Sequence, residues 1–252
     1  MAVPADPTSD FAAPHGSRVV MTTGLHGSAS TWVFNVAREL MIATFGAEAV
    51  LSFFAETPTS LLAYPGVSGR HIVCKTHRWA DLPTSASEGA AAVIVTVRDP
   101  RDCVFSLMGR FGSGFAVSVR AIANDCQHAV ACADAGNPVL RYENRFFDDP
   151  ATVRVLARHL DVAVSDSVAD AIFDRYRSDA VRTFAAAVSS LPPERRSGDG
   201  KPMLFDLVTQ IHRTHIGDAR VGKWRERLDP QQRAEITRPF VPFLARFGYP
   251  AD

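Results

Sequence analysis

Four short hydrophobic runs along the chain predict β-strands. They cover residues 18–24, 71–77, 91–97 and 138–143. Three of them are nearly continuous in valine and isoleucine instead of alternating with polar residues. This pattern is typical of strands that are buried on both faces of a parallel sheet.

Amphipathic helices are predicted between and after these runs. Apolar residues recur at the i, i+3, i+4 and i+7 positions after Trp32 and again after Pro150, which places them on one face of a helix. The two stripes consist of Val33, Val36, Ala37, Leu40 and Met41, and of Val153, Leu156, Ala157 and Leu160.

Three Asp-Pro pairs, at residues 99–100, 149–150 and 229–230, mark predicted helix starts. An aspartate at the N-cap accepts a hydrogen bond from a free backbone N–H, and a proline at the first helical position loses no bond.

The alternation of strands and helices predicts an α/β fold, a single domain with a central parallel β-sheet flanked by helices. No linker divides the chain, so we expect residues 18–252 to form one domain. Residues 1–17 are rich in proline, alanine and polar residues and show no periodicity, so we expect a flexible N-terminus. Residues 189–202 concentrate proline, glycine, serine and charge. They predict a long exposed loop, either a substrate lid or a disordered segment.

Composition excludes some classes of function. The 252 residues hold 27 Lys+Arg and 27 Asp+Glu, a formal net charge of zero, so binding to nucleic acid or anionic membranes through bulk charge is not expected. No apolar run is long enough to span a membrane, and the first residues lack the apolar stretch of a signal peptide. We therefore expect a cytoplasmic protein.

The cysteines do not suggest a disulfide framework or a zinc site. Cys74, Cys103, Cys126 and Cys132 form no Cys-x-x-Cys pair. We expect all of them to be reduced, with Cys74 and Cys103 packed as small core residues.

A loop of small residues, Thr22 to Trp32 (TTGLHGSASTW), joins the first strand to the first helix. Such a loop directs several backbone N–H groups at one point, where the helix dipole also favours an anion. The loop lacks the lysine of a Walker A motif, and a tight turn that needs small residues for packing is the alternative interpretation.

Polar residues follow two further strands. Arg98 directly follows the strand at residues 91–97, and Ser106 lies about two turns into the next helix. The two side chains could therefore bind one phosphate from two sides. An ion pair of Arg98 with Asp99 or Asp102 is the alternative, with Ser106 an ordinary helix residue. Lys75 and His77 end another strand, where a cation and a general base would meet, although a lone histidine there is usually structural.

These motifs, in this order, resemble the sulfotransferases that use 3′-phosphoadenosine 5′-phosphosulfate (PAPS). The family loop Lys-Ser-Gly-Thr-Thr-Trp corresponds here to the segment Gly27-Ser28-Ala29-Ser30-Thr31-Trp32. The resemblance implies that Ser28, Ser30 and Thr31 bind the 5′-phosphate and that Trp32 lies against the adenine. Arg98 and Ser106 match the family's 3′-phosphate motif.

The remaining motifs extend the resemblance to residue 248. Lys75-Thr76-His77 matches the family residue for residue, which implies that His77 is the catalytic base and Lys75 its accompanying cation. Tyr142, in Tyr142-Glu143, would approach the adenine. The segment Arg220-Val221-Gly222, before Lys223-Trp224, resembles the part of the family that closes over the 3′-phosphate. The implied fold is P-loop NTPase-like.

Two departures from the family pattern concern charge. Gly27 replaces the loop lysine, so His26 or Lys75 would have to supply the positive charge beside the leaving group. The family's Arg-Lys pair before the last motif falls on Gly217-Asp218, which leaves Arg220 and Lys223 as basic candidates.

The predicted function is therefore transfer of a sulfuryl group from PAPS to a hydroxyl or amine of a small molecule. The product nucleotide is 3′-phosphoadenosine 5′-phosphate (PAP), and no metal is required. Trp79, Phe111, Phe115 and the 189–202 loop are candidate pocket walls, which favours a phenolic or hydrophobic acceptor. A small-molecule kinase and a PAPS-binding relative without activity remain alternatives, and a homodimer remains open.

Overall fold

A computed structural model describes residues 17–56, 64–77, 91–197, 204–214, 217 and 219–251. Three predictions fall, wholly or almost wholly, outside these residues: the flexible terminus at 1–17, the pocket wall at Trp79, and the part of the predicted loop at 198–202.

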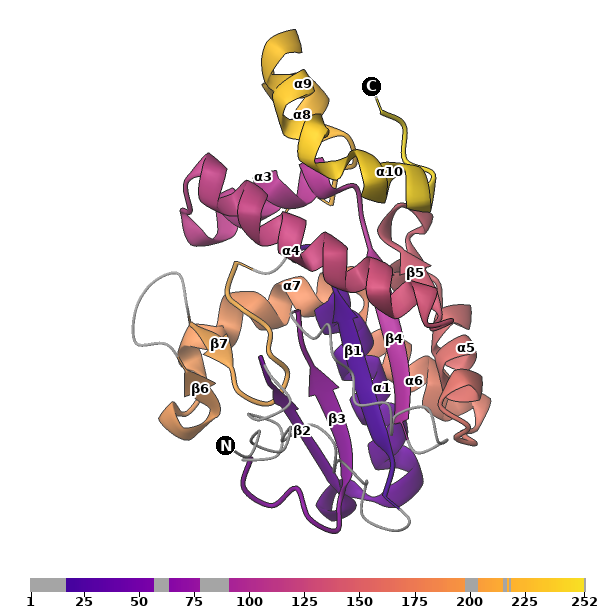
Figure 1. The fold of residues 1–252 in the computed structure, drawn as a ribbon. Coiled ribbons are helices and arrows are strands. Elements are labelled where there is room, and N and C mark those ends of the chain that lie inside the picture. Colours follow the sequence, from indigo (N-terminus) through magenta and orange to yellow (C-terminus); the bar gives the residue numbers. More distant parts are fainter. Residues whose placement is uncertain are drawn as a thin grey trace, which may run out of the picture.

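A five-stranded parallel sheet forms the centre of the protein, with strand order β2-β3-β1-β4-β5 (Figure 1). Its strands are β1 (Val19–Gly24), β2 (Val50–Phe54), β3 (His71–Lys75), β4 (Ala91–Val97) and β5 (Val139–Arg141). All four predicted strands are present. The strand β2, which was not predicted, has five residues at the sheet edge, of which Val50 and Phe53 are buried and the others partly exposed.

Helices cover both faces of the sheet, as predicted. The long helices are α1 (Ser30–Phe45), α3 (Pro100–Phe111), α4 (Phe115–Asp134), α5 (Ala151–His159), α6 (Asp166–Tyr176) and α7 (Ser178–Ala187). Three shorter helices follow: α8 (Lys223–Arg227), α9 (Pro230–Thr237) and α10 (Val241–Phe247). Short 3₁₀ turns lie at Ala47–Ala49, Tyr142–Asn144, Phe146–Asp148, Val188–Ser190, Pro193–Arg195 and Arg238–Phe240.

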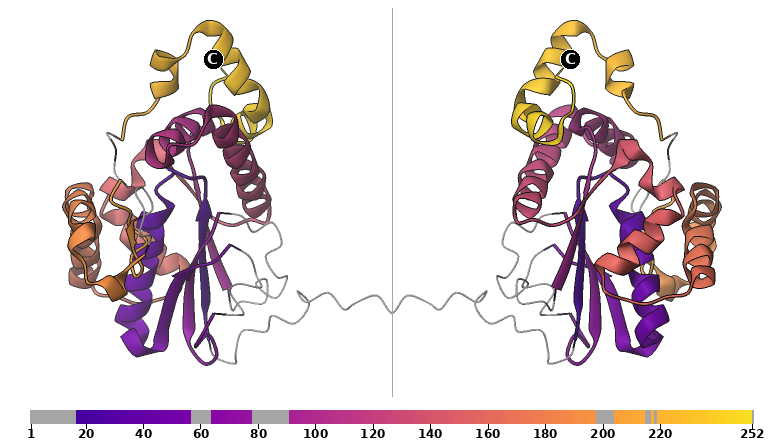
Figure 2. Two further views of the ribbon diagram at one scale, coloured as in Figure 1. Left: turned by 90° about the vertical axis from the view of Figure 1, so that its left-hand side faces the viewer. Right: turned by 90° about the vertical axis from the view of Figure 1, so that its right-hand side faces the viewer.

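The side chains of β1 alternate between two hydrophobic cores because successive residues of a strand point to opposite faces. Val19 and Met21 pack with residues of α4 and α10, whereas Val20 packs with residues of α1, α5 and α6. Figure 2 shows the sheet between these two helical layers. The near-continuous hydrophobic runs are therefore explained by burial on both faces.

Aspartates cap α3 and α9 as the Asp-Pro pairs predict, whereas the N-cap of α5 is Pro150 and Asp149 lies one residue before it. The Asp99 side chain accepts from the Arg101 N–H, and the Asp149 side chain accepts from the Ala151 N–H. Asp229 and Gln232 form a reciprocal capping box. The starts of α3, α5 and α9 were thus predictable from local chemistry.

The predicted loop at residues 189–202 is wrong in its first part. Residues 189–197 contain 3₁₀ turns and the strand β6 (Arg196–Ser197), which pairs antiparallel with β7 (Phe205–Asp206). The Arg195 guanidinium contacts the fully buried Asp206 carboxylate at 2.9 Å, and this ion pair fixes the segment. Sequence composition could not reveal a partner that is distant along the chain.

Two further expectations concern cysteines and the membrane. All four cysteines are buried and free, and Cys74 and Cys103 lie in the core. Within the described ranges no helix is long and apolar enough to cross a membrane.

Candidate functional site

A cavity of about 560 Å³ lies where the carboxyl ends of β1, β3 and β4 meet the N-terminus of α1 and the face of α3. Ligands bind at this edge in open α/β sheets. Most of the residues singled out from the sequence line it: His26, Gly27, Ala29, Ser30, Thr31, Trp32, Lys75, His77, Arg98, Ser106 and Tyr142.

The loop after β1 is held close to its neighbours by two glycines. Gly24 has φ +147°, and a Cβ there would lie 2.2 Å from the Thr96 carbonyl oxygen. Gly27 has φ +86°, and a Cβ there would lie 2.9 Å from Ser106 Oγ. Ala29 caps α1 in the left-handed conformation at φ 66°, a position that favours glycine. The loop therefore turns tightly into the helix, whose first N–H groups have no partner within the helix.

Ser28 differs from the other loop residues because its side chain points into the protein interior. Its hydroxyl lies 2.6 Å from the Leu25 carbonyl oxygen and 2.7 Å from Thr96 Oγ1, and the residue is fully buried. The Ser28 side chain thus stabilises the turn and does not line the cavity.

Arg98 is buried with a guanidinium group aimed at the loop. Its Nη1 donates to the Gly27 carbonyl at 3.0 Å, its Nη2 donates to the Arg220 carbonyl at 2.9 Å, and the group lies 4.1 Å from the centre of the Tyr142 ring. The buried Nε has no hydrogen-bond partner in the structure. Since Ser106 Oγ faces Gly27 as well, one patch of the cavity combines an arginine, a hydroxyl and a glycine loop.

The alternative ion pairs for Arg98 are only partly present. Asp99 pairs with Arg101 at 2.8 Å, whereas Asp102 lies 3.9 Å from Arg98. Burial raises the pKa of Asp102, and hydrogen bonds from the backbone N–H groups of Gly222 and Trp224 oppose this rise. Asp99 is therefore engaged by Arg101, the ion pair of Arg98 with Asp102 is long, and the Arg98 Nε has no hydrogen-bond partner among the described residues.

The segment Arg220-Val221-Gly222 docks beside this patch but does not line the cavity. The Arg220 carbonyl accepts from Arg98, and the Gly222 N–H donates to Asp102 at 2.6 Å. The Arg220 side chain pairs with Glu226 at 3.1 Å, and Val221 is exposed. Gly217, Ala219 and Lys223 line the cavity instead.

His77 is oriented as an acceptor toward the cavity. Its Nδ1 lies 2.6 Å from the Gly24 carbonyl oxygen. A carbonyl only accepts, so Nδ1 carries the proton and Nε2 holds the lone pair of the neutral ring. Burial, together with the charges of His26 and Lys75, lowers the pKa of His77 well below its usual value. The ring is therefore neutral near pH 7.

Lys75 is almost fully buried and lies in the same cavity as His77. Burial, and secondly the charge of Arg110, lowers the pKa of Lys75 to about 7. A nearby anion would restore the charged form because opposite charges favour ionisation.

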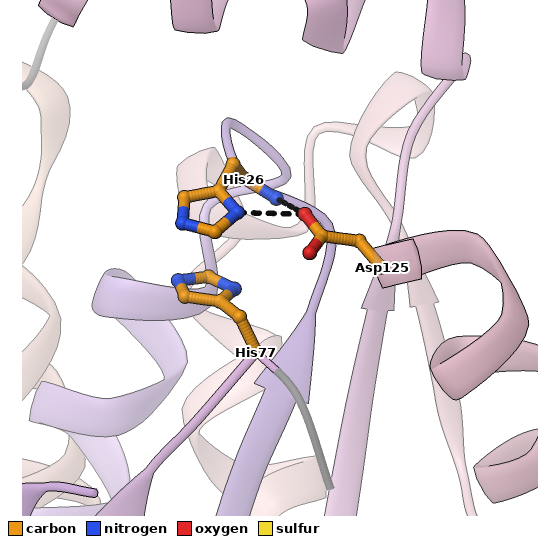
Figure 3. A group of neighbouring side chains, drawn as sticks. All are labelled: His26, His77 and Asp125. Carbon is orange, nitrogen blue, oxygen red and sulfur yellow. Dashed lines mark hydrogen bonds and ion pairs between the residues drawn. The ribbon is translucent and has the colours of Figure 1, made fainter. Parts of the chain in front are cut away.

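The partner of His26, which was not predicted, is Asp125 on α4. The Asp125 carboxylate accepts from the His26 backbone N–H at 2.9 Å and lies 2.6 Å from His26 Nδ1 (Figure 3). The His26 ring stacks on the His77 ring with centroids 3.7 Å apart. Asp125 thus fixes the ring that lies against the candidate base. No local pattern in the sequence could have pointed to this contact.

His26, His77 and Asp125 also form a group whose potential metal-ligand atoms lie within 4.8 Å of one another. The nitrogen lone pairs of an imidazole lie in the ring plane, and the two planes differ by only 22°. The lone pairs therefore run nearly parallel and do not converge on one ion, and His26 Nδ1 is engaged by Asp125.

Aromatic side chains also line the cavity. Phe111 lines it as predicted, whereas Phe115 packs against the core instead. The lining also includes residues of the 204–214 segment that were not predicted: Phe205, Gln210, Ile211, His212 and Thr214.

Comparison with solved structures shows the same fold in sulfotransferase-like proteins. Mouse sulfotransferase SULT7A1 complexed with PAP matches at 14% identity and a TM-score of 0.63, over 93% of this chain and 86% of that chain. Retinol dehydratase in complex with retinol and PAP matches at 15% identity and a TM-score of 0.56, over 90% and 81% of the two chains. Its complex with androsterone and inactive cofactor PAP matches at 15% identity and a TM-score of 0.58, over 90% and 80%.

No protein-family model and no curated protein matches the chain. The likeness to solved structures establishes the fold, and the predicted fold class is confirmed.

Proposed function

We propose that the protein transfers a sulfuryl group from PAPS to a hydroxyl or amine of a small-molecule acceptor. The observation that carries this proposal is the meeting, in one cavity, of an anion-binding loop, the Arg98–Ser106 patch and the neutral His77. The solved structures of the same fold are complexes with PAP, which supports the choice of nucleotide.

The residues present fit a bisphosphorylated nucleotide. The buried Arg98 Nε has no partner within the described ranges, and Ser106 Oγ lies close to Gly27, so this patch suits the 3′-phosphate. The N-terminus of α1, with the hydroxyls of Ser30 and Thr31, suits the 5′-phosphate. Trp32 and Tyr142 would contact the adenine. Arg220, Val221 and Gly222 would contribute by positioning Arg98 and Asp102 rather than by lining the site.

His77 would accept the proton of the attacking hydroxyl at Nε2, while the Gly24 carbonyl holds the ring in that orientation. Lys75, charged in the presence of the donor's anionic group, would stabilise the negative charge that develops on the leaving oxygen. His26 supports the His77 ring from its other face. Catalysis here depends mainly on positioning and charge stabilisation, as in phosphoryl transfer.

Calorimetric titration with PAP, adenosine 5′-phosphate and magnesium-ATP tests the proposal. We expect at least about tenfold tighter binding of PAP than of adenosine 5′-phosphate, since a charge-assisted contact to the extra phosphate contributes roughly 1.5–3 kcal/mol. Tighter binding of magnesium-ATP would favour a kinase. PAP binding with no turnover of PAPS with any acceptor would indicate a relative without activity.

A further inference from the structure

Arg110 is a partly buried cation of the cavity that the proposed mechanism does not use. It lies in the last turn of α3 and lines the cavity. Its Nε is buried without a hydrogen-bond partner, and no ion pair or hydrogen bond of its side chain occurs among the residues that the structure describes. Burial lowers the pKa of Arg110 to about 10. A partly buried guanidinium with no ion pair among the described residues would be stabilised by a ligand anion.

The other arginines of α3 and its N-terminal junction are paired. Arg101 contacts the Asp99 carboxylate at 2.8 Å and two backbone carbonyls, and Arg98 contacts two backbone carbonyls. Within the described part of the chain, Arg110 has only the ring of the adjacent Phe111, at 5.1 Å from its centre. The contrast on one structural element indicates a binding role for Arg110 rather than a structural one.

The described wall of the cavity offers Arg110 no neutralising carboxylate. Asp102 accepts from the Gly222 and Trp224 N–H groups and lies near Arg98. Glu56 is exposed to solvent. The charge that Arg110 meets in the cavity is a like charge, because Arg110 contributes to the lowered pKa of Lys75. The anionic phosphosulfate of the donor would compensate Lys75 beside the loop, and Arg110 would pair with a second anion.

The position of Arg110 assigns that second anion to the acceptor. Ser106 and Arg110 are four residues apart and so share one face of α3, with Ser106 toward Gly27 and Arg110 one turn beyond. Phe111 stands edge-on to His212 with ring centres 5.9 Å apart. Burial, aided by the charge of Arg110, lowers the pKa of His212 to about 3, so its ring is a neutral aromatic wall.

We propose that Arg110 binds a carboxylate of the acceptor, so that the substrate class is a hydroxylated aromatic or apolar acid. This inference rests on the proposed function, because only a sulfuryl transfer makes the bound carboxylate part of an acceptor. A guanidinium pairs with a carboxylate in a bidentate geometry, which would also orient the acceptor hydroxyl relative to His77. The aromatic wall formed by Phe111, His212 and Phe205 would hold the body of the molecule.

The test compares two probes that differ only in charge, 4-hydroxyphenylacetate and 4-hydroxyphenylacetamide. Each is titrated calorimetrically into the protein saturated with PAP. We expect the wild-type protein to bind the carboxylate about tenfold more tightly than the amide, the scale of a charge-assisted hydrogen bond. The preference should vanish in Arg110→Met and persist in the control Arg120→Met, which changes an exposed arginine of α4. Equal affinities in the wild type, no binding of the carboxylate, or a preference that survives Arg110→Met would overturn the proposal.

Two further measurements distinguish acceptor binding by Arg110 from a structural role and from binding of the sulfuryl group. Arg110→Met should leave the unfolding temperature of the free protein unchanged or slightly raised, because it removes a partly buried charge that has no ion pair among the described residues; a large decrease would show a structural role and overturn the inference. The ratio of PAPS to PAP affinity should be the same in Arg110→Met and the wild type, whereas a selective loss of PAPS affinity would assign Arg110 to the sulfuryl group. If PAP itself does not bind, the proposed function fails, and titration of both probes into the free protein still decides whether Arg110 binds carboxylates.

Discussion

We expect the buried Lys75 to make the free energy of unfolding depend on pH. Replacement of Lys75 by methionine should remove this dependence. Burial lowers its pKa from 10.5 to about 7 in the folded protein. The unfolded chain therefore binds more protons than the folded chain between these two values, and stability rises with pH across that window. The destabilisation is fully present below about pH 7 and is lost above about pH 10.5.

The size of the effect follows from the pKa difference. At about 1.36 kcal/mol for each pKa unit, a buried Lys75 costs roughly 4–5 kcal/mol of folding free energy at low pH. Lys75→Met retains the apolar stem without the charge. The variant should be more stable than the wild type by roughly this amount near pH 6, and the difference should shrink steadily toward pH 10.

Urea unfolding of both proteins at a series of pH values measures this difference directly. Lys223→Met is the matched control, because Lys223 also lines the cavity but is partly exposed. A stability difference between the wild type and Lys75→Met that does not change with pH would refute the reasoning. So would a Lys75→Met variant that is less stable at low pH, since this would mean that the ammonium group has a stabilising partner.

Four other substitutions test the assigned roles. His77→Ala should abolish turnover and leave PAP affinity within a few-fold by calorimetry, because the base does not hold the nucleotide; a large loss of affinity would contradict this. Arg98→Ala should weaken PAP binding by about 2–3 kcal/mol while adenosine 5′-phosphate is little affected, and equal losses for both nucleotides would exclude a 3′-phosphate role. Ala29→Gly should raise the free energy of unfolding by about 0.5–1 kcal/mol in denaturant titrations, since it relieves a left-handed alanine, and a decrease would show that chain entropy outweighs the strain. Asp125→Asn should lower that free energy by about 2 kcal/mol and release His26, visible as a changed His26 ring signal in NMR spectra; an unchanged signal would show that the stack on His77 suffices to hold the ring.

Much of the fold could be predicted because it depends on local signals. The strands at β1, β3, β4 and β5 carry hydrophobic runs, and the aspartate caps act within a few residues of each helix start. The edge strand β2 carries a weaker signal, since its VLSFF sequence is only half buried. The structure of the 189–197 segment could not be predicted because the Asp206 carboxylate that orders it lies beyond the predicted loop.

Some residues of the candidate site could likewise be predicted from the sequence and others could not. Lys75, His77 and Arg98 lie at or just after strand ends, so topology brings them to one edge of the sheet, and Ser106 lies on the helix that follows Arg98. Asp125 reaches His26 across 99 residues, and nothing in either segment indicates the contact. Ser28 shows a different limit, because the motif locates the residue but not the direction of its side chain, which is set by the buried Thr96 hydroxyl.

The glycine at position 27 explains where the positive charge of the site must come from. A side chain there would begin 2.9 Å from Ser106 Oγ and 3.1 Å from Ser106 Cβ, on a backbone with φ +86°. A lysine at this position could not be accommodated without displacing Ser106 from the patch it shares with Arg98. The loop therefore lies close to α3 at Gly27, and no lysine side chain is present at this position. Burial lowers the pKa of Lys75 to about 7, and under the proposed function the anionic donor would favour its charged form. Gly27 thus allows the loop to pack closely against α3, and Lys75 on β3 is the residue that could supply the positive charge.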